Sequence, residues 1–194
     1  MEDYCPYLVR IFCACLATIY VPAIWLQVKI VLIPKTSRSS YTRPKDFRSI
    51  SLISFQLKTM ERPVDRFLRN KDPTLTPLHP NQHAYKAGKS KEMALHQLVV
   101  WVGKVYGQQK MALGVFIDVE GALKNTSFDS MCAALVRHGL DYTSVWWSRA
   151  MLEGCLAMMT FNGYLMRAAV SRGCPQGGML LPLLWCFIAS LLMI

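Results

Sequence analysis

A single carboxylate at the end of an apolar run is the feature of this sequence best suited to chemistry. The run from Ala112 to Ile117 is apolar and is followed directly by Asp118. A run of this length, bounded by polar residues, is typical of a β-strand covered on both faces. Because an isolated charge is costly inside a core, we expect Asp118 where the strand emerges, beside cations, metal ions or water. A solvated carboxylate at a strand end is the simpler alternative.

Basic residues give the chain a net charge of +10 at pH 7 and a pI near 9.4. Such an excess predicts a polyanionic partner, either nucleic acid or an acidic membrane surface. A polar loop at 36–46 carries three of the cations, and a second basic loop, QHAYKAGKS at 82–90, is centred on Tyr85. Each loop is either a solvated turn or a surface that contacts phosphates.

Cysteine usage and hydropathy narrow the protein class. The seven cysteines are an odd number without a CxxC pair, which predicts free thiols in a reducing, intracellular compartment rather than a disulfide framework. Two uncharged stretches, at 11–28 and 177–194, reach the lower length limit of a membrane-spanning helix. Pro22 interrupts the first and the second begins in a loop, so no membrane span is expected.

Both helices and strands are needed to position the residues that could do chemistry. Helical spacing of apolar residues predicts helices at 6–19, 50–69, 90–106, 126–139 and 143–153 and in the C-terminal apolar segment. In these helices we expect Pro63 to kink or end the second, Ser90 to cap the third and Thr126 to cap the fourth. Strands are expected at 25–33 and 112–117 and in a hairpin, 155–161 with 164–170, around Asn162-Gly163. This mixture with an antiparallel hairpin predicts an α+β fold.

Five segments of the chain, taken in order, resemble the reverse transcriptases of non-LTR (LINE-type) retrotransposons, most closely the jockey-like ones. They are VKIVLIPK at 28–35, KDFRSISLISFQLKTMER at 45–62, PNQHAYKAGKS with ALHQLV within 80–99, FIDVEGALKNTSFDS at 116–130 and RGCPQGGMLLPLLW at 172–185. The last two look like motifs A and B of that family. The resemblance implies a right-hand polymerase fold, with a fingers-like region at 1–110 and an incomplete palm at 111–194, truncated after motif B.

The resemblance also implies residue roles and partners: an RNA template, a DNA primer and deoxynucleotide triphosphates. Asp118 and the carbonyl of Val119 would bind Mg²⁺, or Mn²⁺ in its place, for two-metal nucleotidyl transfer. The nucleotide would contact Lys35, Arg48, Leu123 at the usual steric-gate position, and Gln176. The template and primer would contact Gln176, Gly177, Tyr85, Lys86 and Lys89.

The chain departs from the family at several of these positions. The family takes its two other metal-binding carboxylates from a later aromatic-Ala-Asp-Asp hairpin, whereas no acidic residue follows Glu153. Ser49 and Lys124 also differ from the residues usual in the family. Since one carboxylate cannot hold two Mg²⁺ ions tightly, we expect a truncated reverse transcriptase domain that is inactive alone. A non-catalytic RNA- or DNA-binding remnant, or a small membrane protein using 11–28 and 177–194, are the alternatives.

Overall fold

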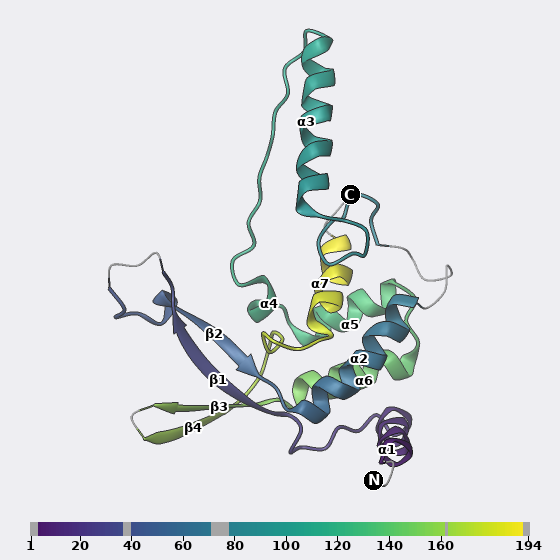
Figure 1. Cartoon of the computed structure of the whole chain (residues 1–194), viewed down its shortest axis with the longest axis vertical. Coiled ribbons are helices and arrows are strands. Elements are labelled where there is room, and N and C mark those ends of the chain that lie inside the picture. Colours follow the sequence, from purple (N-terminus) through teal and green to yellow (C-terminus); the bar gives the residue numbers. More distant parts are fainter. Residues whose placement is uncertain (1–3, 37–39, 71–77, 162, 192–194) are drawn as a thin grey trace.

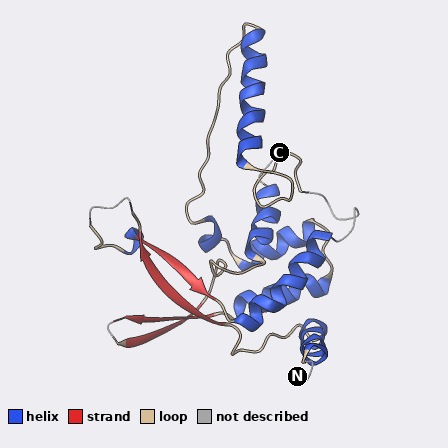
Figure 2. Cartoon of the chain, viewed as in Figure 1, coloured by secondary structure: helices blue, strands red, loops and turns tan. Residues whose placement is uncertain are grey.

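The computed structural model of the chain places one β-sheet beside a group of packed helices, with one helix projecting away from both (Figures 1 and 2). It describes residues 4–36, 40–70, 78–161 and 163–191, except for the side chains of Asn70 and Leu123. The elements are α1 (Cys5–Ala17), β1 (Gln27–Pro34), a 3₁₀ turn (Pro44–Asp46), β2 (Phe47–Leu52), α2 (Phe55–Asn70), α3 (Lys91–Gly107), α4 (Ala122–Asn125), α5 (Phe128–Arg137), α6 (Tyr142–Glu153), β3 (Leu156–Phe161), β4 (Tyr164–Ala169) and α7 (Leu181–Ser190). The prediction of a mixed α and β fold is therefore confirmed.

The sheet has the strand order β2-β1-β3-β4. β1 is antiparallel to β2 along its length and parallel to β3 over three residues. The predicted hairpin is confirmed: Phe161 pairs with Tyr164, which leaves a two-residue connection, and Gly163 has the positive φ of +80° that such a turn needs. Among the described residues no strand pairs with the outer edge of β2. A loop of the candidate site contacts that edge instead.

The helical core is built from α2, α5, α6 and α7. α5 packs against both α6 and α7. The side chains of Trp147, Met131, Leu135 and Leu184 are almost completely buried there. In the part of the chain that the structure describes, no helix is long and apolar enough to cross a membrane.

The predicted helix at 50–69 was wrong in its first part. Residues up to Leu52 belong to β2, and the helix begins at Phe55, where the amide of Leu57 bonds to the Ser54 hydroxyl at 3.2 Å. Pro63 does not end the helix, which continues to Asn70. An internal proline costs a helix about 3 kcal/mol, and burial of the α2 face formed by Leu57, Met60, Val64 and Leu68 offsets that cost.

The predicted strand at 112–117 was also wrong. Beyond α3 the chain runs back toward the body in extended form, without strand pairing, up to residue 119 (Figure 1). The side chains of Leu113, Phe116 and Ile117 are 85–86% exposed. An extended segment becomes a strand only when a neighbour satisfies its backbone N–H and C=O groups, and the described sheet contains only β1 to β4.

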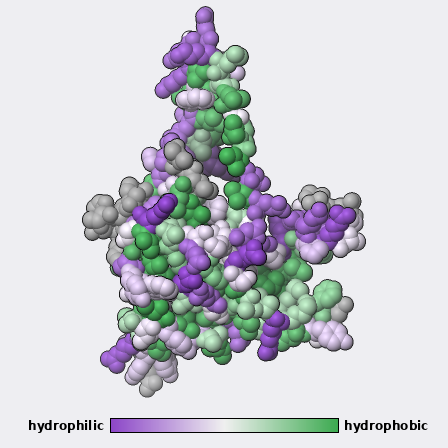
Figure 3. All heavy atoms as spheres, turned by 180° about the vertical axis from the view of Figure 1, so that it is seen from behind, coloured by the Kyte–Doolittle hydropathy of each residue, from purple (hydrophilic) through white to green (hydrophobic). Residues whose placement is uncertain are grey.

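α3 and the extended segment, residues 91–119, form a projection that we call the arm. Ser90 caps α3 as predicted, because its hydroxyl accepts a hydrogen bond from the amide of Met93 at 3.2 Å. No residue of α3 is buried, however. Figure 3 shows hydrophobic side chains on the surface of the arm. The apolar face that the sequence predicts on this helix is therefore present, but no described element covers it.

Two local predictions need smaller corrections. The cap of α5 is Ser127 rather than Thr126: the Ser127 hydroxyl accepts from the amide of Ser130, whereas the Thr126 hydroxyl donates to the carbonyl of Ala122 at the start of α4. The apolar spacing at 6–19 predicts a helix with one buried stripe, but in α1 Cys15 is the one buried residue. Helical spacing identifies which residues share a face, but only neighbouring elements determine whether that face is covered.

Candidate functional site

The loop at 172–178, RGCPQGG, lies between two segments that are distant from it in sequence. The amide of Ser51 in β2 donates to the carbonyl of Gln176 at 2.9 Å. At the other side of the loop, the amide of Gly173 donates to the carbonyl of Thr126 at 2.8 Å. The loop is therefore attached both to the free edge of β2 and to the segment that follows α4.

Two glycines make these close approaches possible. At Gly177, φ is +134°, and an added Cβ would lie 2.4 Å from the carbonyl oxygen of Ser51. At Gly173, φ is +76°, and a Cβ would lie 2.4 Å from the carbonyl oxygen of Lys124. Side chains at these positions would be strained and would also collide with backbone.

A cavity of about 140 Å³ lies between this loop and the sheet. Its lining is made of Val28, Ile30, Ser49, Ser51, Lys124, Ala157, Val170, Arg172, Cys174, Pro175 and Gln176. Two cations and no carboxylate line it, and the Lys124 ammonium donates to the Ser49 hydroxyl at 2.7 Å. Since ligand pockets start at roughly 300 Å³, this space suits a phosphate or the edge of a base rather than a whole nucleotide.

The structure brings some predicted nucleotide contacts to this cavity but not others. Gln176 lines it, whereas Arg48 does not. Because side chains alternate along a strand, Arg48 lies on the face of β2 opposite to Ser49 and is exposed. Lys35 follows β1 directly, and its ammonium donates to the carbonyl of Lys45 at 2.7 Å across the hairpin.

Asp118 and Val119 lie at the end of the arm, before the turn at Gly121 that leads into α4. Both side chains are exposed. The carbonyl of Val119 accepts a hydrogen bond from the amide of Ala122 at 3.3 Å. Among the described residues no group of three or more His, Cys, Asp or Glu could hold a metal ion. Mg²⁺ requires several oxygen ligands, so these residues by themselves do not fit a two-ion centre.

The other predicted contacts lie elsewhere. The side chain of Leu123 is outside the described part of the structure. Tyr85, Lys86 and Lys89 belong to a loop that packs on the second half of α7. There the side-chain amide of Gln82 donates to the carbonyl of Cys186 at 3.2 Å. Gln176 precedes α7, whose ten residues rise by about 15 Å in total. The predicted template contacts therefore fall in two segments, one before α7 and one beside its second half.

Sequence reasoning missed Glu61, a buried carboxylate on α2. Its side chain accepts a hydrogen bond from the amide of Met179, at the end of the loop. Burial raises the pKa of the Glu61 carboxyl, and the amides of Met179 and Leu180 offset part of that rise. A signal was present in the sequence: Glu61 falls at helical spacing between Leu57 and Val64, on the stripe that α2 buries.

Comparisons with known proteins agree on one family. The family model described as reverse transcriptase (RNA-dependent DNA polymerase) matches residues 33–193. The chain is 25% identical over 187 residues to a 115 kDa protein of the retrotransposable element R1DM of Drosophila melanogaster, covering 96% of this chain and 18% of the relative.

Two further relatives are Pol polyproteins described as retrovirus-related. One is from the type-1 retrotransposable element R1 of Bradysia coprophila (26% identical, 97% of this chain, 18% of the relative). The other is from the type-1 retrotransposable element R2 of Popillia japonica (27% identical, 86% of this chain, 23% of the relative). The chain thus spans about a fifth of the length of the curated relatives that it matches.

Proposed function

Because the chain belongs to the reverse transcriptase (RNA-dependent DNA polymerase) family of non-LTR retrotransposons, we propose that it supplies the fingers and part of the palm of an RNA-directed DNA polymerase. The observation that carries this proposal is the attachment of the glycine-rich loop at 172–178 to β2. It leaves Gln176, Lys124 and Arg172 around a cavity suited to an anionic or base-edge contact. In this proposal residues 1–110 are the fingers and residues 111–194 belong to the palm.

The proposed contacts are those that the family resemblance implies. Gln176 and Gly177 lie against the nascent base pair and the template, and the cations of the β1–β2 hairpin, including Lys35 and Arg48, contact phosphates. The remaining contacts proposed for the nucleotide, template and primer are those of Leu123, Tyr85, Lys86 and Lys89. The template is RNA, the primer is DNA, and the substrates are deoxynucleotide triphosphates.

The family generally uses divalent metal ions. We propose that Asp118 and the carbonyl of Val119 contribute to an Mg²⁺ site whose other ligands are not grouped with them among the described residues. The 194-residue chain with Mg²⁺ or Mn²⁺ is therefore expected to extend a DNA primer on an RNA template no further than a reaction without protein. The measurement is gel-resolved primer extension, and an active reverse transcriptase added to the same mixture serves as the control. Extension by this chain that Asp118→Asn abolishes would contradict the expectation.

Nucleic-acid binding is expected to depend on the hairpin cations. Replacing Lys35, Arg43, Lys45 and Arg48 by glutamine is expected to weaken binding of a labelled RNA–DNA hybrid at least tenfold. It should also lower the salt dependence by about three ion equivalents, since each phosphate contact contributes roughly 0.7–0.9. Asp118→Asn should leave the affinity unchanged. Fluorescence anisotropy at several salt concentrations measures both quantities.

A second variant that loses the same number of charges tests whether the effect on binding is local to the β1–β2 hairpin. Replacing Arg10, Lys91, Lys104 and Lys110 by glutamine removes the same four charges from α1 and the arm. If both variants bind equally weakly, or if the unmodified chain does not bind at low salt, the proposed hairpin contact is wrong.

A role in nucleic-acid binding without catalysis is the second candidate, because the described residues contain no group of acids able to hold a metal ion. A chimera distinguishes the two. This chain would replace the matching fifth of an R1-type relative, and primer extension would be measured with and without Asp118→Asn. Extension that depends on Asp118 supports the polymerase, whereas binding without extension supports the second candidate.

A further inference from the structure

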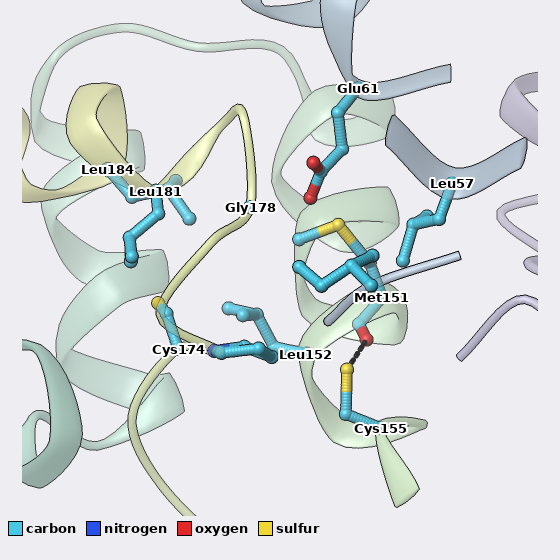
Figure 4. Close-up of a pocket in the computed structure, with 11 residues that line it drawn as sticks. Leu57, Glu61, Met151, Leu152, Cys155, Cys174, Gly178, Leu181 and Leu184 are labelled. Carbon is cyan, nitrogen blue, oxygen red and sulfur yellow. Dashed lines mark hydrogen bonds between the residues drawn. The ribbon is translucent and has the colours of Figure 1, made fainter. Parts of the chain in front are cut away.

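We propose that Glu61 is a positioning residue, which attaches the loop at 172–178 to the unit formed by β2 and α2 by accepting a hydrogen bond from Met179, just before α7. Its side chain is 2% exposed, and its Oε2 accepts a hydrogen bond from the amide of Met179 at 2.7 Å. Figure 4 shows the carboxylate pointing from α2 toward the chain at Gly178. The attachment stands on this geometry alone, and its consequence for nucleic-acid binding rests on the proposed function.

The hydrogen bond between Met179 and Glu61 lies next to the amino end of α7, which has no side-chain cap of its own. The first amides of a helix have no partner within the helix. The N-cap residue of α7, Leu180, makes no side-chain hydrogen bond to the helix. Glu61, on α2, instead binds the amide of Met179, the residue before this N-cap. A carboxylate is favoured so near the amino end of a helix because that end carries partial positive charge.

The position of Glu61 links this hydrogen bond to the position of Gln176. α2 starts three residues after β2 ends, so Glu61 and Ser51 belong to one continuous part of the chain. The loop is held to that part at two points only three residues apart, the carbonyl of Gln176 and the amide of Met179. Loss of the second point would leave Gln176 held by its single bond to Ser51.

The fit around the carboxylate is tight. A Cβ added at Gly178 would lie 3.2 Å from Glu61 Oε1 and 3.3 Å from Ile53 Cδ1. The cavity beside Glu61 has a volume of about 10 Å³, and its other lining side chains include Leu57, Met151 and Leu152 (Figure 4). A space of roughly 10–15 Å³ holds one water molecule at most. Glu61 therefore cannot contact a nucleotide, and its influence on binding must act through the loop.

Two variants test the attachment. Glu61→Met keeps most of the volume but removes the acceptor, whereas Glu61→Gln keeps an acceptor oxygen. Hydrogen exchange of the peptides covering 174–182 should be at least tenfold faster in Glu61→Met and within twofold of the unmodified chain in Glu61→Gln. Exchange in the β3–β4 hairpin should be unchanged in both. Hybrid affinity should fall severalfold in Glu61→Met and should be restored in Glu61→Gln.

The pH dependence of stability gives a readout that loss of packing would not produce. Because burial raises the pKa of Glu61 in the folded protein, protonation favours folding: this contribution is complete below the ordinary glutamate pKa of about 4.3 and is lost as the pH rises through the folded pKa. The unmodified chain should therefore lose stability relative to Glu61→Gln as the pH rises through that window. If the difference in stability between the unmodified chain and Glu61→Gln does not change with pH, Glu61 is not a buried carboxylate in the folded protein.

Hydrogen exchange in the unmodified chain also tests the proposal. If the amide of Met179 in the unmodified chain exchanges as fast as the amide of Arg172 in the same loop, Glu61 does not hold it and the proposal is wrong. If the chain fails to bind the hybrid while Met179 is protected and Glu61→Met releases it, the proposed function is wrong but the attachment stands.

Discussion

Replacement of Gly177 by alanine is expected to destabilise the protein by about 2–4 kcal/mol and to separate the loop at 172–178 from β2. At φ +134° an L-residue is strained by roughly 1–3 kcal/mol. The added methyl group would also lie 2.4 Å from the carbonyl oxygen of Ser51, which is backbone in a paired strand and can move only with β2. The hydrogen bond from Ser51 to Gln176 should therefore be lost.

Urea unfolding followed by circular dichroism measures the loss of stability. Gly88→Ala is the matched control: its φ of +71° is also positive, but no heavy atom lies within 4 Å of the added Cβ. It should cost only about 1–2 kcal/mol, the usual penalty of the left-handed conformation. If Gly177→Ala is no more destabilising than Gly88→Ala, the close approach of the loop to β2 is not a feature of the folded protein.

Cys174, in the same loop, is expected to react with an alkylating reagent about a thousandfold more slowly in the folded protein than in the unfolded chain. Burial raises the pKa of the Cys174 thiol to about 12, and nearby Cys155 and Glu61 contribute to the rise. The thiolate is the reactive form. At pH 8 about one thiol in ten thousand is ionised at that pKa, against about one in four at the ordinary value of about 8.5.

Alkylation at pH 8, followed by mass spectrometry of the cysteine-containing peptides, gives the rate at each position with and without concentrated urea. The exposed Cys13 shows that the reagent is active. Cys155, whose pKa burial likewise raises to about 12, is the internal control for general unfolding. Folded-state labelling of Cys174 within tenfold of Cys13 would contradict the buried loop. In Gly177→Ala and Glu61→Met, Cys174 should react faster while Cys155 stays slow.

The arrangement of the site explains why only part of it could be predicted. Gln176 and Gly177 lie in a short glycine-rich motif, so their importance is visible in the sequence. The contact between Ser49 and Lys124 joins residues 75 positions apart, and nothing local to either residue indicates the other. Only the structure places them together at the cavity.

Local interactions account for what the sequence determined by itself: the hairpin around Asn162-Gly163, the cap at Ser90, the mixed fold and the family. The hairpin and the cap depend on a few consecutive residues and the family on its motifs, whereas the mixed fold follows from the pattern of elements along the whole chain. Tertiary structure alone decided that residues 112–117 are unpaired, that β2 precedes α2, and that Glu61 binds the amide of Met179. A strand forms only beside another strand, and a buried carboxylate needs a hydrogen-bond donor. Whether the described residues provide that partner is decided by the fold and not by the local sequence.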